Sequence, residues 1–557
     1  MNCDQLIPSN DVIDIIISRD EQGRVQEIPD CIQTLDGPYD LYYYKRERVP
    51  PLSIREYSYS SIPKCLGLLD TTALEVSGII QLQNQSALSL RGQGVLVGFI
   101  DTGIAYENAC FRNPDGSTRI TAIWDQTGEQ SPPQGYLYGT EYTKEQINAA
   151  LVSEDPRAIV PQTDENGHGT FLASIACGSE DAPNNFVGAV PESDILVVKL
   201  KPAKPYLRNF FYIPEEAVVY QENDVMAAID YLDRKARELG KPLVVCVALG
   251  MNNGSHAGSG VLSDYLNYVG GLWQRCVVIA TGNEANARHH VMGESTMEDP
   301  STEMEISLEK PMEGFYLELW ANAPELFSVG IRAPGGSLYQ PSATQLGGHQ
   351  EHEFYLENTR VEIDYRTVGR TRGDQLIFIR FDRPTRGIWT VYVYPDTTIT
   401  GYFHAWLPMT GMLPENVIFL EPDPDTTLTT PSSAYVPITV GGYNAADGAL
   451  YLESGRGYTT MNSVKPDFTA PAVNVQGVGL RGIYMTGSGT SIAAAITSGA
   501  CAQVLEWGLR RERAIGLNSA EIGNILIRGC ERDKDRVYPN SQWGYGRLNV
   551  YNAFRNL

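Results

Sequence analysis

Short runs of apolar residues that do not alternate with polar ones constrain the fold of this chain more than any other feature. They occupy residues 95–100, 195–198, 243–249 and 276–280. Such runs are typical of strands covered on both faces, as in a parallel sheet flanked by helices. Between Asn223 and Gly240 apolar residues recur at helical spacing, and Gly240 is expected to end that helix. An α/β core is therefore predicted between about residues 94 and 282.

The pattern changes after residue 288. Up to about residue 430, apolar and polar residues alternate in short segments, such as 315–320, 376–381 and 388–393, which are separated by clusters of Gly and Pro. This alternation predicts an antiparallel β-sandwich inserted into the core. The α/β pattern then resumes, with a strand at 436–440 and an Ala-rich helix at 488–509.

A chain of 557 residues is too long for one ordinary domain, which agrees with an interrupted core. The predicted organisation is an N-terminal segment (1–70), the first part of the core (71–289), the sandwich (290–431) and the second part of the core (432–557). Within the N-terminal segment, residues 13–17 and 42–44 are candidate strands.

The charge balance argues against several classes of partner. The chain has 43 Lys and Arg against 67 Asp and Glu, a net charge of −24, so neither nucleic acid nor an anionic membrane surface is expected to bind. No uninterrupted apolar run approaches the roughly 18 residues of a membrane-spanning helix. The residues after Met1 lack a basic region, so we expect no signal peptide and a cytoplasmic location.

The nine cysteines are odd in number, scattered and without a CxxC pair. This spacing favours reduced thiols over a disulfide framework or a zinc site.

Three residues flanked by glycine carry the candidate chemistry. Asp101 follows the strand at 95–100, His168 lies between Gly167 and Gly169, and Ser491 precedes the Ala-rich helix. Each alone is more often a turn or cap residue. Together they supply a nucleophile, a base that takes its proton, and a carboxylate that orients the base.

A fourth residue, Asn283, follows the strand at 276–280. Its carboxamide can donate a hydrogen bond to an oxyanion, and a helix that starts near Ser491 would favour the same negative charge. A simple turn-forming role for Asn283 is the alternative.

The order Asp, His, Ser and the surrounding segments resemble the subtilisin-like serine proteases, the subtilase family. The segments are 101–103, 168–170, 281–284 and 489–491, with weaker matches at 248–250, 465–471 and 543–549. The resemblance implies a subtilisin-like fold, a triad of Asp101, His168 and Ser491, and an oxyanion hole containing Asn283. It also implies substrate binding by Ala248, Leu249, Gly250 and Gly282.

Two positions depart from the family pattern: Phe171 stands where many members have a second His, and Ala495 replaces a common Pro. Neither position performs proton transfer. The insertion and the run Ala493-Ala494-Ala495 resemble clostridial spore-germination subtilases, in which a jelly-roll domain is inserted at this point. The active member of that group cleaves a cell-wall hydrolase zymogen, whereas some relatives are regulators without activity.

The resemblance therefore implies an endopeptidase with a protein or peptide substrate, cytoplasmic or spore-associated. The alternative is a regulatory pseudoprotease that acts through partner contacts. The resemblance also implies a propeptide, which we expect the protein to cleave itself between residues 62 and 72. The extended-looking segment 61–70 would lie along residues 248–250.

No cofactor is expected, and no metal ligands are assigned. His349 and His352 could form a metal pair but lack a third ligand, and a structural calcium ion is left open. His289 and His290 are expected on a solvated loop.

Overall fold

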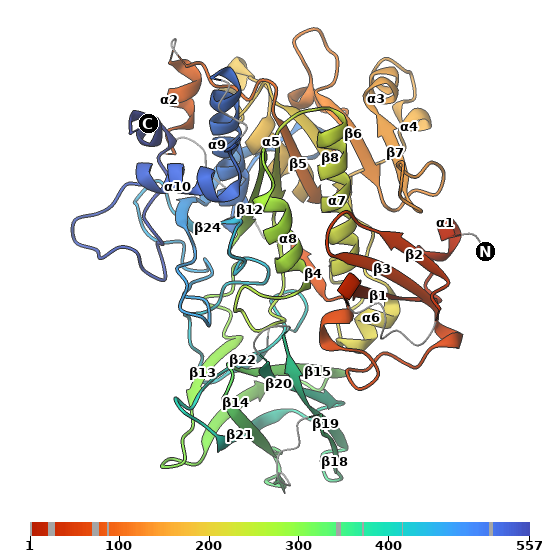
Figure 1. Cartoon of the computed structure of the whole chain (residues 1–557), viewed down its shortest axis with the longest axis vertical. Helices are drawn as coiled ribbons and strands as arrows, with labels where there is room; N and C mark the ends of the chain where they lie inside the picture. Colours follow the sequence, from red (N-terminus) through yellow and green to blue (C-terminus); the bar gives the residue numbers. More distant parts are fainter. Residues whose placement is uncertain are drawn as a thin grey trace.

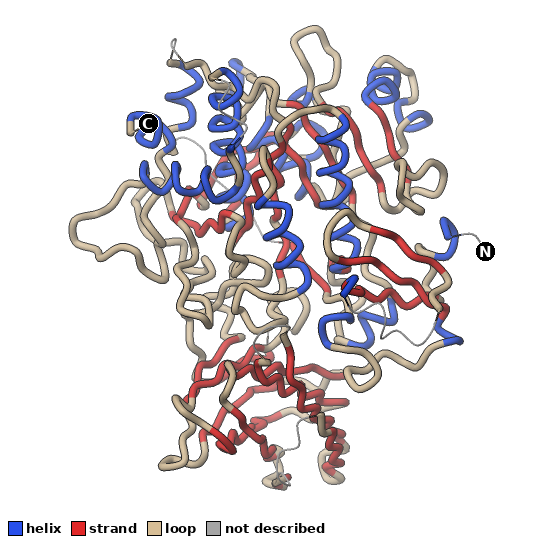
Figure 2. Tube along the Cα trace, in the orientation of Figure 1, coloured by secondary structure: helices blue, strands red, loops and turns tan. Residues whose placement is uncertain are grey.

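The computed structural model describes residues 3–20, 28–68, 77–85, 88–340, 347–369, 373–414, 416–511 and 516–556. Figure 1 shows a large sheet with helices in the upper part of the molecule and a separate group of antiparallel strands at the lower end. Figure 2 shows the same division, with the helices concentrated in the upper part. The helices are α1 (Cys3–Leu6), α2 (Ile79–Asn84), α3 (Lys144–Leu151), α4 (Pro156–Ile159), α5 (His168–Cys177), α6 (Pro205–Phe210), α7 (Glu222–Glu238), α8 (Val261–Gly271), α9 (Thr490–Arg510), α10 (Ser519–Gly529) and α11 (Val550–Arg555).

The predicted parallel core is present as an eight-stranded sheet. In spatial order its strands are β25 (Phe468–Pro471), β24 (Ile438–Tyr443), β12 (Arg275–Ala280), β10 (Leu243–Val247), β5 (Leu96–Asp101), β8 (Asp194–Lys199), β6 (Ile120–Asp125) and β7 (Thr140–Thr143). All neighbours run parallel except β7, which pairs antiparallel with β6. The subtilisin-like fold class expected from the sequence is confirmed.

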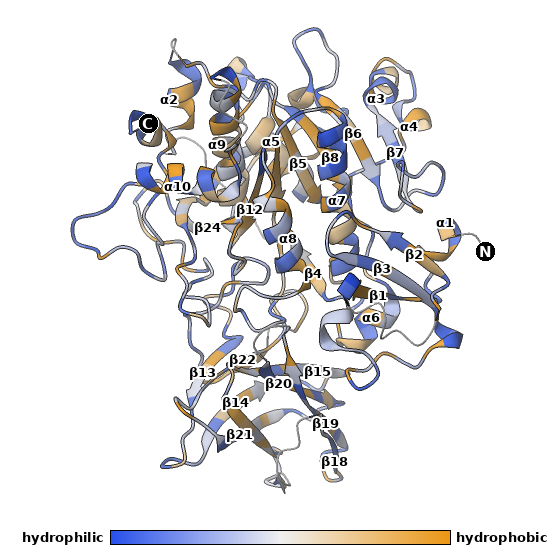
Figure 3. Ribbon diagram, viewed as in Figure 1, coloured by the Kyte–Doolittle hydropathy of each residue, from blue (hydrophilic) through white to orange (hydrophobic). Residues whose placement is uncertain are grey.

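Both faces of this sheet are covered, which explains the absence of alternation in its strands. In β5, Val97 and Phe99 pack into one apolar cluster with α5 and α9, whereas Leu96 and Ile100 pack into another with α7 and α8. Burial on both faces is the main free-energy gain that holds such strands. Figure 3 shows that the ribbon of internal strands such as β5 is coloured mainly as hydrophobic.

The insertion consists of two antiparallel sheets packed around their own apolar core. One sheet contains β13 (His290–Glu294), β22 (Tyr402–Trp406), β15 (Gly314–Ala321), β20 (Asp374–Asp382), β19 (Thr359–Val368) and β18 (His349–Phe354). The other contains β17 (Leu338–Tyr339), β16 (Leu326–Arg332), β21 (Gly387–Thr397), β14 (Thr302–Leu308) and β23 (Val417–Phe419). This is the expected antiparallel sandwich, whereas its jelly-roll topology and the domain boundaries remain predictions.

The N-terminal segment forms a small sheet of β1 (Val12–Ser18), β3 (Tyr39–Lys45) and β2 (Cys31–Thr34), in that spatial order. It lies against α6 and α7 (Figure 1). The buried Asp14 of β1 accepts hydrogen bonds from Lys204 Nζ at 2.5 Å and Gln221 Nε2 at 2.9 Å. A buried ion pair thus joins this segment to the core.

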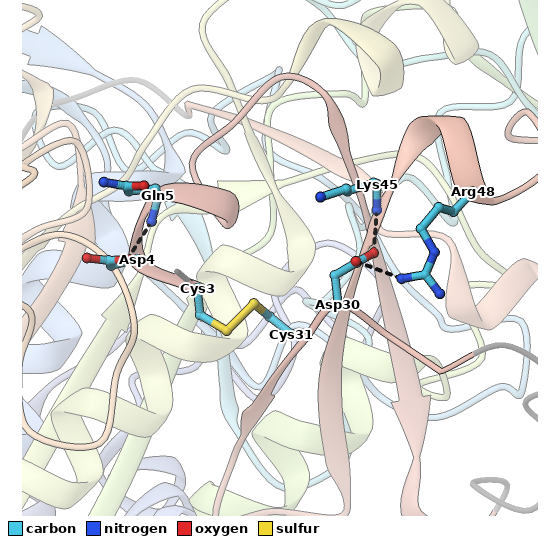
Figure 4. The surroundings of a disulfide bond; sticks show 7 residues. All are labelled: Cys3, Asp4, Gln5, Asp30, Cys31, Lys45 and Arg48. Carbon is cyan, nitrogen blue, oxygen red and sulfur yellow. Dashed lines mark hydrogen bonds and ion pairs between the residues drawn. A yellow bond between two sulfur atoms is a disulfide. The ribbon is translucent and has the colours of Figure 1, made fainter. Parts of the chain in front are cut away.

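The expectation that every cysteine is a free thiol is wrong. Cys3 and Cys31 form a disulfide, shown in Figure 4 beside the Asp30–Arg48 ion pair. The chain returns from α1 to β2 and brings the two Cα atoms to 5.8 Å, a proximity that cysteine spacing does not encode. The remaining cysteines are buried and free, and burial raises the pKa of the Cys246 thiol to about 12.

The expected solvated loop at His289 and His290 is also wrong. Both side chains are buried, because the chain passes here from β12 into β13 at the junction with the insertion. His289 Nδ1 lies 2.7 Å from Glu284 Oε2, and His290 Nδ1 lies 3.0 Å from the carbonyl oxygen of Asp423.

Helix α9 is long and apolar enough by composition to cross a membrane, although its Thr, Ser and Gly residues interrupt the apolar run. However, 89% of its most apolar window is buried inside the protein. It is the central helix on one face of the sheet.

Candidate active site

Asp101 and His168 are in direct contact. Asp101 is the last residue of β5 and His168 the first of α5, and both are more than nine-tenths buried. His168 Nδ1 lies 2.8 Å from Oδ1 and 2.9 Å from Oδ2 of Asp101. A carboxylate in this position fixes the imidazole tautomer that leaves Nε2 as the proton acceptor.

Glycine permits this close approach. A Cβ atom on Gly169 would lie 2.3 Å from the carbonyl oxygen of Gly103 and 3.0 Å from Asp101 Cβ. The residue before His168, Gly167, has φ +92°, which glycine adopts without strain. The glycines on either side of His168 thus bring α5 against the end of β5.

Asp164 holds the turn that precedes His168, a role that the sequence analysis did not assign. Its carboxylate accepts hydrogen bonds from Thr102 Oγ1 at 2.8 Å, Gly167 N at 2.7 Å, and Thr170 N and Oγ1 at 2.9 and 2.6 Å. One buried carboxylate therefore joins the residue after Asp101 to the first turn of α5. Its only sequence signal is an Asp three residues before a glycine, a common turn pattern.

Ser491 is the second residue of α9 and is fully buried. The chain reaches it through the antiparallel hairpin of β26 (Val473–Val478) and β27 (Tyr484–Ser488). This hairpin packs on α5, where Val478 N donates to Ser174 Oγ at 2.8 Å. Ser491 thus lies at the positive end of the helix dipole, which favours nearby negative charge.

Asn283 lies beside the start of α9. Its Oδ1 accepts hydrogen bonds from Thr490 N at 3.2 Å and Thr490 Oγ1 at 3.1 Å, while Gly282 N donates to Thr490 Oγ1 at 3.1 Å. Within the described part of the chain, Asn283 Nδ2 has no hydrogen-bond partner. The carboxamide oxygen is therefore held by Thr490, the residue before Ser491, and the amide donor is available to an incoming group.

The substrate-binding residues expected at 248–250 already pair with another segment of the same chain. Strand β4 (Cys65–Leu68) lies between β11 (Leu249–Gly250) and β9 (Val219–Gln221) in a three-stranded sheet. Leu68 pairs antiparallel with Leu249, and Gly67 with Gly250. The expected extended pairing is confirmed for these two residues. Residues 69 and 70 of the same segment lie outside the described residues.

Thr429, which the sequence analysis missed, packs against two of the expected substrate-binding glycines. A Cβ on Gly250 would lie 2.4 Å from Thr429 Oγ1, and a Cβ on Gly282 would lie 2.4 Å from Thr429 Cγ2. Thr429 N also donates to the carbonyl oxygen of Thr281 at 2.9 Å. The chain leaving the insertion therefore contacts both the segment 248–250 and the turn at 281–283. Ala248, the first residue of that segment, is buried.

No group of three or more potential metal ligands occurs among the described residues. The imidazole of His349 instead contacts Asp364, with 3.1 Å between Nδ1 and Oδ1.

Comparison with known proteins agrees with this arrangement. Residues 92–308 and 420–546 match Peptidase S8, described as the subtilase family. The chain is similar to the solved CspB protease of Clostridium perfringens, with 30% identity, a TM-score of 0.76, and coverage of 86% of this chain and 97% of that one. The prenylagaramide maturation protease PagA matches at 14% identity with a TM-score of 0.43, covering 86% of this chain and 98% of that one. No protein with a curated description matches the chain.

Proposed function

Because this chain belongs to the subtilase family and is a subtilisin-like serine endopeptidase, we propose that Ser491 is its nucleophile, with His168 and Asp101 as the other triad members. His168 Nε2 takes the proton of Ser491 Oγ as that oxygen attacks the peptide carbonyl. The same proton then passes to the leaving amine. Water, activated by His168, hydrolyses the acyl-enzyme and restores Ser491.

The oxyanion of each tetrahedral intermediate would accept hydrogen bonds from Asn283 Nδ2 and Ser491 N. These donors are aimed at charge that develops only during reaction, which is why they lower the barrier. The nucleophile, base and donors all belong to this chain, so the proposed reaction uses no cofactor.

The contact of His168 with both oxygens of Asp101 carries this proposal, because a binding-only role has no need for a buried carboxylate on that imidazole. A fluorophosphonate probe tests it, since such probes modify only activated serines. We expect labelling of the wild-type chain and none of Ser491→Ala or His168→Ala. A folded wild-type chain that resists labelling would favour the regulatory pseudoprotease instead.

We also propose that the protein cleaves its own N-terminal segment shortly after Leu68, within the expected interval of residues 62–72. Support comes from β4, which lies between β9 and β11, the strand expected to bind substrate; the position between these two strands is here called the groove. Intact-mass measurement should show two fragments from the wild-type chain and one intact chain from Ser491→Ala. An uncut wild-type chain that hydrolyses peptides would contradict self-cleavage while leaving the endopeptidase assignment in place.

For the physiological substrate we propose a spore cell-wall hydrolase zymogen, cut at a limited number of sites during germination, with the protease located in the spore. The inserted sandwich and the similarity to the CspB protease support this choice. Incubating the purified protease with such a zymogen, and mapping new N-termini by mass spectrometry, tests it. One or two discrete cuts that depend on Ser491 are expected, whereas no cut or general degradation would contradict the proposal.

A further inference from the structure

A buried carboxylate on the insertion joins three parts of the molecule. Glu318 lies on β15, is 1% exposed and accepts hydrogen bonds from four donors. Two come from the core, Asn253 Nδ2 at 2.6 Å and Gly254 N at 2.9 Å. One comes from the insertion, Trp320 Nε1 at 2.9 Å, and one from the N-terminal segment, the hydroxyl of Tyr59 at 2.8 and 2.9 Å.

The core partners of Glu318 follow directly after the groove strand. Asn253 and Gly254 lie three and four residues beyond Gly250, the last residue of β11. The insertion makes a second hydrogen bond to Asn253: the hydroxyl of Tyr316 donates to its Oδ1 at 3.0 Å. Two side chains of the sandwich, Glu318 and Tyr316, therefore hold the residues that follow the expected substrate-binding segment 248–250.

The N-terminal partner, Tyr59, lies six residues before Cys65, the first residue of β4. Lys64, the residue before β4, donates from Nζ to the carbonyl oxygen of Tyr59 at 2.8 Å, and its Nζ lies 4.4 Å from the centre of the Tyr59 ring. Lys64 Nζ also lies 3.6 Å from the buried Glu222. Burial, reinforced by the negative charge of Glu318, raises the pKa of Tyr59 well above its usual value, so the phenol keeps its proton and remains a donor.

We propose that Glu318 is a positioning residue for the substrate groove: it fixes the Asn253–Gly254 end of the groove and, through Tyr59, retains the chain's own strand β4 in it. The insertion thereby controls how readily the N-terminal segment gives way to substrate. The carboxylate is suited to this task because it has no cation among its described partners, and only these neutral donors compensate its burial. Loss of the Tyr59 hydroxyl removes the hydrogen bond between the N-terminal segment and Glu318, while the donors from the core still bond to the carboxylate.

Hydrogen exchange of the full chain in the Ser491→Ala background tests retention of β4 without requiring cleavage. We expect Tyr59→Phe and Glu318→Gln to increase the exchange rate of amides in β4 and β11 about tenfold or more. Tyr57→Phe is the matched control, because it removes a hydroxyl that donates to Pro50 within the same segment. Glu325→Gln is the second control, because the described hydrogen-bond donors to Glu325 are backbone and hydroxyl groups inside the insertion, at residues 399–401.

Separate measurement of KM and kcat distinguishes a positioning role from simple destabilisation of the fold. In the active chain, Tyr59→Phe should lower the apparent KM for a short peptide severalfold at unchanged kcat, because the competing strand leaves more readily. Asn253→Ala should raise KM, because it loosens the groove itself. Unchanged exchange and KM in Tyr59→Phe, or equal effects in Tyr57→Phe, would overturn the proposal. Failure of self-cleavage would appear separately, as an uncut mass for the wild-type chain.

Discussion

The backbone of Leu68 pairs antiparallel with that of Leu249, so a strand from the N-terminal segment lies in the groove expected to bind substrate. On its other side the same strand pairs with β9, for example Leu66 with Tyr220. A strand with partners on both sides is held by two ladders of backbone hydrogen bonds, which do not depend on the side chains of the inserted strand. A substrate in an extended conformation could use the same ladders.

The close packing of Gly250 against Thr429 gives a steric test of this groove. Gly250→Ala would place a Cβ 2.4 Å from Thr429 Oγ1. We expect β11 to shift, the free energy of unfolding to fall by about 1–3 kcal/mol, and KM for a short peptide to rise. The double variant Gly250→Ala with Thr429→Gly should recover much of the KM, because the clash is removed.

Gly271→Ala is the matched control for this substitution, since a Cβ there meets no atom within 4 Å. It should leave KM at the wild-type value. If Gly250→Ala matched this control in both KM and melting temperature, the groove would not be as closely packed as described.

Asp101→Asn tests the orienting role of the buried carboxylate. The substitution keeps the size of the side chain but removes the charge that fixes the His168 tautomer, and a loss of about 10⁴ in kcat is expected by analogy with other Ser-His-Asp triads. Asp155→Asn, at an exposed position whose side chain caps no helix, should leave kcat unchanged. A loss below about tenfold in Asp101→Asn would remove Asp101 from the triad.

Asn283→Ala separates an oxyanion donor from a turn residue. Loss of one donor to transition-state charge is expected to lower kcat by about 10²–10³, with little change in KM. Asn283→Gly should be equally impaired, because it also lacks the amide. Near-wild-type kcat in Asn283→Gly, at an unchanged melting temperature, would show that the residue only shapes the turn.

Thr490→Val tests how that donor is positioned. The variant loses the hydroxyl bonds to Asn283 Oδ1 and from Gly282 N but keeps the backbone bond from residue 490 to Asn283. A smaller loss of kcat than in Asn283→Ala is therefore expected, measured on the same peptide. A loss equal to that of Asn283→Ala would place the whole positioning effect in the Thr490 hydroxyl.

The sequence predicted those features that depend on local periodicity. Unbroken apolar runs such as the one in β10 identified the parallel core, because strands covered on both faces have no polar face. The loss of helical spacing after Arg288 identified the insertion. The glycines beside His168 marked a close approach of backbone segments, which the contact of Gly169 with Gly103 explains.

Features that depend on which distant segments meet were not predictable. The disulfide between Cys3 and Cys31 and the burial of His290 both depend on tertiary contacts that leave no local periodicity. Glu318 lies in an alternating strand where a Glu is expected to face solvent. It is buried because partners 259 residues earlier and 65 residues earlier in the chain, Tyr59 and Asn253, meet it there.

The paired histidines at the junction of core and insertion predict an acid-sensitive stability. His290 Nε2 lies 3.0 Å from His404 Nδ1, and burial lowers the pKa of each imidazole to about 3. The unfolded chain therefore binds more protons than the folded chain between about pH 6.5 and pH 3. The stability that these neutral histidines contribute is present above about pH 6.5 and is lost as the pH falls through that window. Near pH 5 each histidine should add about 1.4 kcal/mol per pH unit to the slope of the unfolding free energy against pH.

Urea unfolding of His404→Gln between about pH 7 and pH 4 should show a slope of the unfolding free energy against pH that is lower by that amount. The wild-type chain and the variant differ only at residue 404, so the difference between their slopes reports on the histidine. Equal slopes in His404→Gln and the wild-type chain would show that His404 is not held neutral at the junction.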